Sequence, residues 1–201
     1  MFITRAIIRN MMLSVERGIE TQRFAMLWLA SYVFLLRVPS EALPMCRGEP
    51  GSVADEQSVI FLESPDTVCL KLKSRKNKIG GSVLKRKCCC KACSATCPVH
   101  ALWHNFFEKM EVGARPWADV SPNEARGHLR FTLQALGVSA ASSVVARLAS
   151  CGLLVKVSFP ELYGTHDFRR GHAKVWPSVS RCACAHLCGH RTCRTPVHRW
   201  P

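Results

Sequence analysis

The feature that most constrains the fold is a nearly continuous apolar run of 13 residues, from Phe24 to Leu36. The run is too short to cross a bilayer, because a membrane-spanning helix needs about 20 apolar residues. We therefore predict a largely buried helix over Thr21 to Arg37, packed inside a globular domain. Pro39 follows the run, and since proline lacks a backbone N–H, we expect the helix to stop there.

A β-hairpin is predicted further along the chain. The segments 58–63 and 67–73 are apolar or alternate between apolar and polar residues, and Ser64-Pro65-Asp66 stands between them as a turn. Alternation with a period of two is typical of strands. A third strand is expected around 81–84, so the predicted sheet is small and antiparallel.

Several other segments of the sequence are predicted to be helical. Short helical segments are predicted at 40–45 and 99–110. Ser121 followed by Glu124 is a capping-box signature, which predicts a helix that begins there and ends near Leu136, before Gly137. The predicted fold class is accordingly α+β, mainly α with a small antiparallel β-sheet.

Positive charge is concentrated in two segments. The chain has 28 Lys and Arg against 14 Asp and Glu, a formal net charge of +14. Nine of the basic residues lie within 71–91, where there is no acidic residue, and seven lie within 165–201 beside one acid. The rest of the chain is nearly neutral, which argues against an acidic-surface protein and favours a polyanionic partner.

Two motifs carry a family resemblance. The first is Tyr32-Val-Phe-Leu-Leu-Arg37-Val-Pro-Ser-Glu41, and the second is Gly164-Thr-His166-Asp-Phe-Arg169-Arg-Gly-His-Ala173, with the basic hairpin between them. In this order they resemble the catalytic domain of the tyrosine recombinase (phage integrase) superfamily, most closely its fungal mobile-element members. The resemblance implies a DNA partner, an oligomer on DNA as an option, no membrane, and the nucleus or cytoplasm. It implies no cofactor for catalysis.

The resemblance also implies roles for individual residues. Arg37 and Arg169 would clamp the scissile phosphate, because planar guanidinium groups match phosphate oxygens bidentately. His166 would donate a hydrogen bond or a proton, and Glu41 would orient Arg37. The hairpin lysine that protonates the leaving oxygen would be Lys76, with Lys73 and Lys78 as alternatives. Further DNA contacts are expected from four residues: Lys73, Arg75, Lys78 and Arg170.

The chain departs from the family pattern at the nucleophile. The family places a tyrosine well downstream of its second motif, whereas this sequence has only Tyr32 and Tyr163. We therefore expect DNA binding without cleavage. The expected organisation is an N-terminal remnant at 1–20, a partial, incomplete catalytic domain at 21–174 with an insertion at 139–156, and an unassigned basic Cys/His-rich tail at 175–201 that is expected to be disordered.

Cysteine and histidine gather at 88–100, within the partial domain. Cys90, Cys93, Cys97 and His100 have the spacing C-x2-C-x3-C-x2-H, which could close a tetrahedral Zn²⁺ site of structural type. Cys88 and Cys89 are competing ligands, and free cysteines in a reducing compartment are the alternative interpretation.

The sequence thus leaves three functional hypotheses. The first is a DNA-binding, recombinase-like fragment that grips a phosphate. The second is a small zinc-stabilised module that binds nucleic acid through the Cys/His segment and its basic flanks. The third is a truncated gene product without cellular activity.

Overall fold

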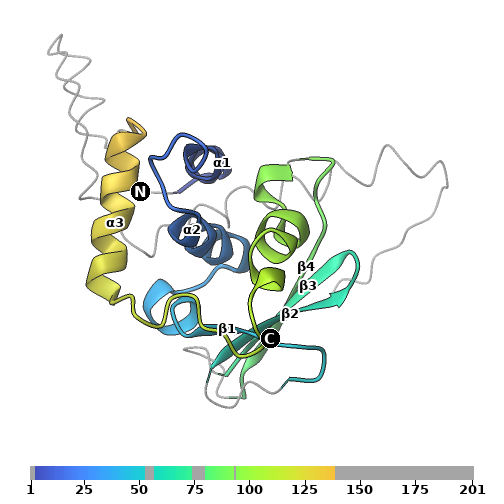
Figure 1. Cartoon of the computed structure of the whole chain (residues 1–201). Coiled ribbons are helices and arrows are strands. Elements are labelled where there is room, and N and C mark those ends of the chain that lie inside the picture. Colours follow the sequence, from blue (N-terminus) through green and yellow to red (C-terminus); the bar gives the residue numbers. More distant parts are fainter. Residues whose placement is uncertain (1–2, 53–56, 74–79, 93, 139–201) are drawn as a thin grey trace, which may run out of the picture.

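A computed structural model describes residues 3–52, 57–73, 80–92 and 94–138. These residues form helices on one side of a small sheet (Figure 1). The helical elements are α1 (Arg5–Ser14), α2 (Gln22–Phe34), the π-helical η1 (Val38–Ala42) and η3 (Pro98–His104), the 3-10 turns η2 (Ser94–Thr96) and η4 (Phe107–Lys109), and α3 (Pro122–Ala135). The strands are β1 (Met45–Arg47), β2 (Ser58–Ser64), β3 (Thr67–Leu72) and β4 (Ser82–Lys87).

The predicted α+β class is confirmed, but the sheet is mixed rather than antiparallel. Its order is β1-β2-β3-β4, with β2, β3 and β4 antiparallel and β1 parallel to β2. The sequence predicted a short helix over 40–45, whereas the helical turn runs from Val38 to Ala42 and a strand begins at Met45. A strand of three residues is too short to show an alternating pattern, which explains the wrong prediction.

The buried helix predicted from the apolar run is confirmed as α2. Thr21 caps its N-terminus by accepting a hydrogen bond from the backbone N–H of Phe24, and every residue from Phe24 to Phe34 is buried. The helix ends three residues earlier than predicted. Leu35 adopts the left-handed conformation, with φ of 58°, and the backbone N–H of Leu36 donates to the carbonyl of Ser31 at 2.9 Å. This backbone geometry ends the helix before Pro39.

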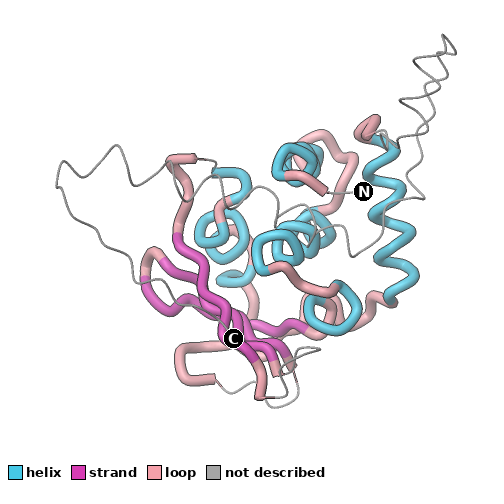
Figure 2. Tube along the Cα trace, turned by 180° about the vertical axis from the view of Figure 1, so that it is seen from behind, coloured by secondary structure: helices cyan, strands magenta, loops and turns pink. Residues whose placement is uncertain are grey.

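Helix α2 lies among the other helices (Figures 1 and 2). Helix α1 packs on it through Ile8 and Met11, which are fully buried. The helix predicted over 99–110 is divided, because η3 ends at His104 and a separate 3-10 turn follows. Trp117 packs in the same core against Phe106 and Phe107, and its indole N–H donates to the carbonyl of Arg23.

The capping box that was predicted for α3 is confirmed. The Ser121 hydroxyl accepts from the N–H of Glu124 at 3.1 Å, and the Glu124 carboxylate accepts from the N–H of Ser121 at 3.4 Å. The helix ends where Gly137 takes a φ of 64°, and the N–H of Val138 then donates to the carbonyl of Leu133. Both ends of α3 therefore follow the local sequence signals.

A buried carboxylate connects α3 to α2. Glu20 is 4% exposed, and its Oε2 accepts from the indole N–H of Trp28 at 3.3 Å and from the Thr132 hydroxyl at 2.6 Å. Its Oε1 accepts from the N–H of Thr21 at 2.8 Å and lies 3.5 Å from Nδ1 of His128. We call Glu20, Trp28, His128 and Thr132 the Glu20 junction. It satisfies a buried charge with several donors, as a buried carboxylate requires.

Candidate metal centre

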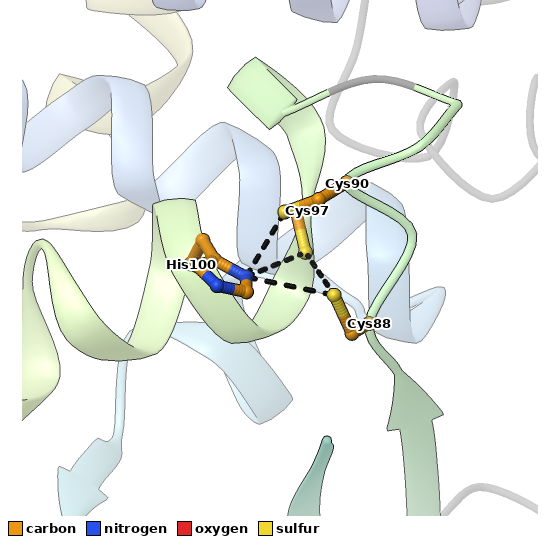
Figure 3. Close-up of side chains that lie close together, drawn as sticks. All are labelled: Cys88, Cys90, Cys97 and His100. Carbon is orange, nitrogen blue, oxygen red and sulfur yellow. Dashed lines mark hydrogen bonds between the residues drawn. The ribbon is translucent and has the colours of Figure 1, made fainter. Parts of the chain in front are cut away.

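Three cysteines and one histidine meet where strand β4 turns toward η3 (Figure 3). Cys88 directly follows β4, and its N–H donates to the carbonyl of Asp66 at 2.7 Å, which fixes the end of the strand to the hairpin turn. Cys97 is the N-cap residue of η3, and Pro98 begins that helix. One end of the sheet and one end of a helix therefore supply the ligands. We call Cys88, Cys90, Cys97 and His100 the Cys/His cluster.

The distances within the Cys/His cluster match a tetrahedral zinc site. With zinc-to-sulfur and zinc-to-nitrogen bonds of about 2.3 and 2.05 Å, a tetrahedron has edges of about 3.8 Å between sulfurs and about 3.6 Å between sulfur and nitrogen. The Sγ atoms of Cys88 and Cys97 are 3.7 Å apart. Nδ1 of His100 lies 3.5 Å from Sγ of Cys88 and 3.6 Å from Sγ of Cys97. Three edges of the tetrahedron are thus already formed.

Cys90 completes the set of four. Its Sγ lies 2.9 Å from Nδ1 of His100, and all four ligand atoms lie within 4.8 Å of one another. This 2.9 Å contact is shorter than the sulfur-to-nitrogen edge of about 3.6 Å that a tetrahedral zinc site requires, so a bound ion would hold the sulfur farther from the imidazole. The Cys/His cluster could therefore bind a metal ion, and its soft thiolate and imidazole donors are those that zinc prefers in structural sites.

The backbone around Cys97 favours its thiolate. Burial raises the pKa of this thiol, but hydrogen bonds from the N–H groups of His100 and Cys89 outweigh it, and the pKa falls to about 6. The N–H of Cys89 donates to Sγ of Cys97 at 3.4 Å. Such donors to a ligating sulfur are typical of metal sites, because they orient the ligand and stabilise its negative charge.

Cys89 stands between two members of the cluster in the sequence, but it is not one of the four residues whose ligand atoms converge. Burial raises the pKa of the Cys89 thiol to about 11, and the neighbouring Cys97 sulfur adds to the effect. The pKa of the Cys90 thiol is also raised, to about 12, so the convergence of ligand atoms, and not the pKa, separates Cys89 from the cluster.

Of the predicted ligand set, the structure brings Cys90, Cys97 and His100 together, and Cys88 lies with them. Cys93 lies outside the described residues. Cys88 is one of the two competing ligands expected from the sequence, and the structure brings its Sγ to the other three ligand atoms.

Of the residues implied by the recombinase resemblance, the structure describes three. Glu41 is buried, and its carboxylate accepts from the backbone N–H of Arg37 at 2.9 Å, so the pair is in contact. The Nε atom of Arg37 is buried and has no hydrogen-bond partner among the described residues. Lys73 is exposed just beyond the end of β3. The other implied residues lie outside the described residues: Arg75, Lys76, Lys78, His166, Arg169 and Arg170.

The basic segment divides into structural and exposed residues. Lys71 Nζ donates to the carbonyl of Ser52, Lys85 pairs with Glu63 at 2.6 Å, and Arg86 Nε donates to the carbonyl of Val33. These three cations contribute to the packing of the sheet. Lys87 and Lys91 are exposed on either side of the first two cluster cysteines.

Comparison with known proteins identifies no relative: no family model, curated protein or solved structure matches the chain. Within the part of the chain that the structure describes, no helix is both long and apolar enough to span a membrane.

Proposed function

We propose that this domain binds nucleic acid and that a zinc ion in the Cys/His cluster stabilises its binding surface. The observation that supports the proposal best is the convergence of four ligand atoms within 4.8 Å at the end of a basic strand. A metal there ties β4 to η3 and so fixes Lys87 and Lys91, the exposed cations beside it. The formal charge of +14 favours a polyanion as the partner.

Zinc acts here as a structural ion. All four positions of a tetrahedral site are filled by protein ligands, and a site of this type leaves no place for water or substrate. The ion would supply folding free energy and hold the β4 end in place, while the surrounding cations contact phosphate groups. Such contacts release counterions from the nucleic acid, so affinity falls steeply with salt.

The test combines metal content with binding. The full chain is purified without added metal, its zinc is quantified, and its affinity for a duplex oligonucleotide is measured with and without a chelator. We expect one zinc per chain and a loss of affinity on chelation. Full affinity after complete zinc removal would contradict the proposal.

A second candidate is the recombinase-like phosphate grip, and one observation favours it. The buried Nε of Arg37 lacks a hydrogen-bond partner among the described residues, and Glu41 holds the adjacent backbone. A guanidinium with an unsatisfied donor is suited to receive a phosphate oxygen. Under this candidate, Arg37→Ala combined with Arg169→Ala abolishes DNA binding while chelation has little effect. Under the zinc-stabilised candidate, the pattern is reversed.

A further inference from the structure

A second basic site lies on helix α1, beside the segment that follows β4. A pocket of about 330 Å³ is lined by Arg5, Ala6, Arg9 and Asn10 of α1 and by Ala92. No acidic side chain lines it. Arg5 and Arg9 are four residues apart, so they share one face of the helix. Two guanidinium groups therefore border one hollow.

The packing of α1 fixes where this arginine pair stands. Ile8 and Met11 are fully buried against the core, whereas Arg9 and Asn10 are exposed and Arg5 is half-buried. The Thr4 side chain caps the helix by accepting from the N–H of Ile7. The arginines are thus held on a short, anchored helix rather than on a mobile arm.

The opposite wall belongs to the Cys/His cluster segment. Ala92 lies between Cys90 and Cys97, and both of these are members of the cluster. A metal that holds the two cysteines also fixes the position of Ala92. The small alanine side chain leaves the pocket open, and Lys91 adds an exposed cation next to it in the sequence.

We propose that this pocket binds a backbone phosphate of nucleic acid between Arg5 and Arg9; this inference rests on the proposed nucleic-acid function. Guanidinium groups bind phosphate oxygens bidentately and stay charged at every working pH. The volume far exceeds the roughly 30 Å³ of one water, so a phosphate group fits together with bridging waters. Free phosphate shares this chemistry and is the other source that the test distinguishes.

The experiment compares two double variants with equal loss of charge. Arg5→Gln/Arg9→Gln removes the pocket cations, and Arg115→Gln/Arg126→Gln removes two exposed arginines elsewhere. For a random-sequence duplex, we expect about a tenfold or greater loss of affinity in the pocket variant and a smaller loss in the control. The slope of log affinity against log salt should fall by about 0.9 in the pocket variant, because the contact with one phosphate is lost. Equal slopes for the two variants would overturn the inference.

A second pair of variants tests the alanine wall without touching the arginines. Ala92→Glu places an acid in the pocket, and Ala118→Glu places one at an exposed position elsewhere. We expect only Ala92→Glu to weaken duplex binding several-fold while zinc content and thermal midpoint stay unchanged. Equal effects of the two variants would overturn the inference.

Inorganic phosphate separates the two sources of the ligand. If wild type binds the duplex and phosphate competes only at concentrations far above those of the duplex, the pocket is part of a nucleic-acid surface. If wild type does not bind the duplex at low salt, the proposed function fails. Thermal protection by inorganic phosphate that is lost only in Arg5→Gln/Arg9→Gln would then assign the pocket to free phosphate and overturn the nucleic-acid occupant.

Discussion

The Glu20 junction and the Cys/His cluster both connect separate elements of the chain, but they differ in what completes them. At the Glu20 junction, a buried carboxylate receives donors from Trp28, Thr132 and the backbone. In the Cys/His cluster, four potential ligand atoms lie within 4.8 Å of one another, and three of their separations suit a central ion. The first connection is complete in the folded chain, whereas the second could take up a metal ion. Under the proposed function, hydrogen bonds hold the helices together and a metal sets the position of the binding surface.

Removing the metal should have the largest effect on the molecule. Cys97→Ser deletes the most buried ligand, and we expect complete loss of zinc and a loss of stability of about 3 kcal/mol or more, because binding to a structural site contributes directly to folding. Zinc stoichiometry and urea unfolding measure the two effects. Cys89→Ser is the matched control and should keep one zinc per chain. Equal zinc content in Cys97→Ser and Cys89→Ser would contradict the idea that a metal completes the Cys/His cluster.

Disrupting the Glu20 junction should have the second-largest effect on stability. Glu20→Ala removes the carboxylate that accepts from the indole N–H of Trp28 and from the Thr132 hydroxyl. The hydroxyl keeps the carbonyl of His128, at 3.0 Å, as an acceptor. Buried donors that lose their partner are costly, and we expect a loss of about 3 kcal/mol with unchanged zinc content. The exposed Glu16→Ala serves as control and should stay within about 0.5 kcal/mol of wild type. Loss of zinc in Glu20→Ala would show that the two connections are not independent.

The turn that leads into β4 offers a smaller test. Gly81 has a φ of 76°, and an added Cβ would stand 2.5 Å from the carbonyl oxygen of Leu72. Gly81→Ala should therefore cost about 2 kcal/mol and weaken zinc binding, because β4 delivers Cys88 to the cluster. Gly137→Ala is the control, since its φ is also positive but its Cβ would meet open space. If both variants lower the free energy of unfolding by the same amount, the contact with the Leu72 carbonyl oxygen does not contribute to the effect.

The smallest effect is expected at the cap of α3. Ser121→Ala removes the hydroxyl that accepts from the N–H of Glu124, and we expect a loss of about 1 kcal/mol in urea unfolding. Ser40→Ala, at an exposed position, is the control and should change the free energy of unfolding by only a few tenths of a kcal/mol. Zinc content should stay the same in both variants. A cost at Ser121 equal to that at Glu20 would mean that the α3 attachment depends on the cap rather than on the carboxylate.

Local signals account for the parts of the fold that the sequence predicts. The α3 capping box, the hairpin of β2 and β3, and the apolar run of α2 each depend on residues that are neighbours in sequence. Helix α1 was not predicted although its sequence is amphipathic, with Ile8 and Met11 buried and Arg9 exposed. Strand β1 is only three residues long, and its pairing depends on β2.

The candidate site could be predicted only in part, for a related reason. Cys90, Cys97 and His100 are recognisable from ligand type and spacing, but Cys88 enters because β4 ends directly before it. Glu20 gives no sequence signal at all, because its partner Thr132 is 112 residues away. Contacts of that separation follow from packing of the whole domain, not from a motif.

The separation along the chain also sets an order of assembly. Cys88 and His100 are 12 residues apart, so bringing the cluster ligands together closes a short loop at low entropic cost. Glu20 must wait for Thr132, 112 residues later. During synthesis all four cluster ligands have emerged once His100 has, and a metal could capture them before α3 exists. Of these two connections, the cluster is thus the one that can form first, and it would fix the end of β4 before α3 packs on the core.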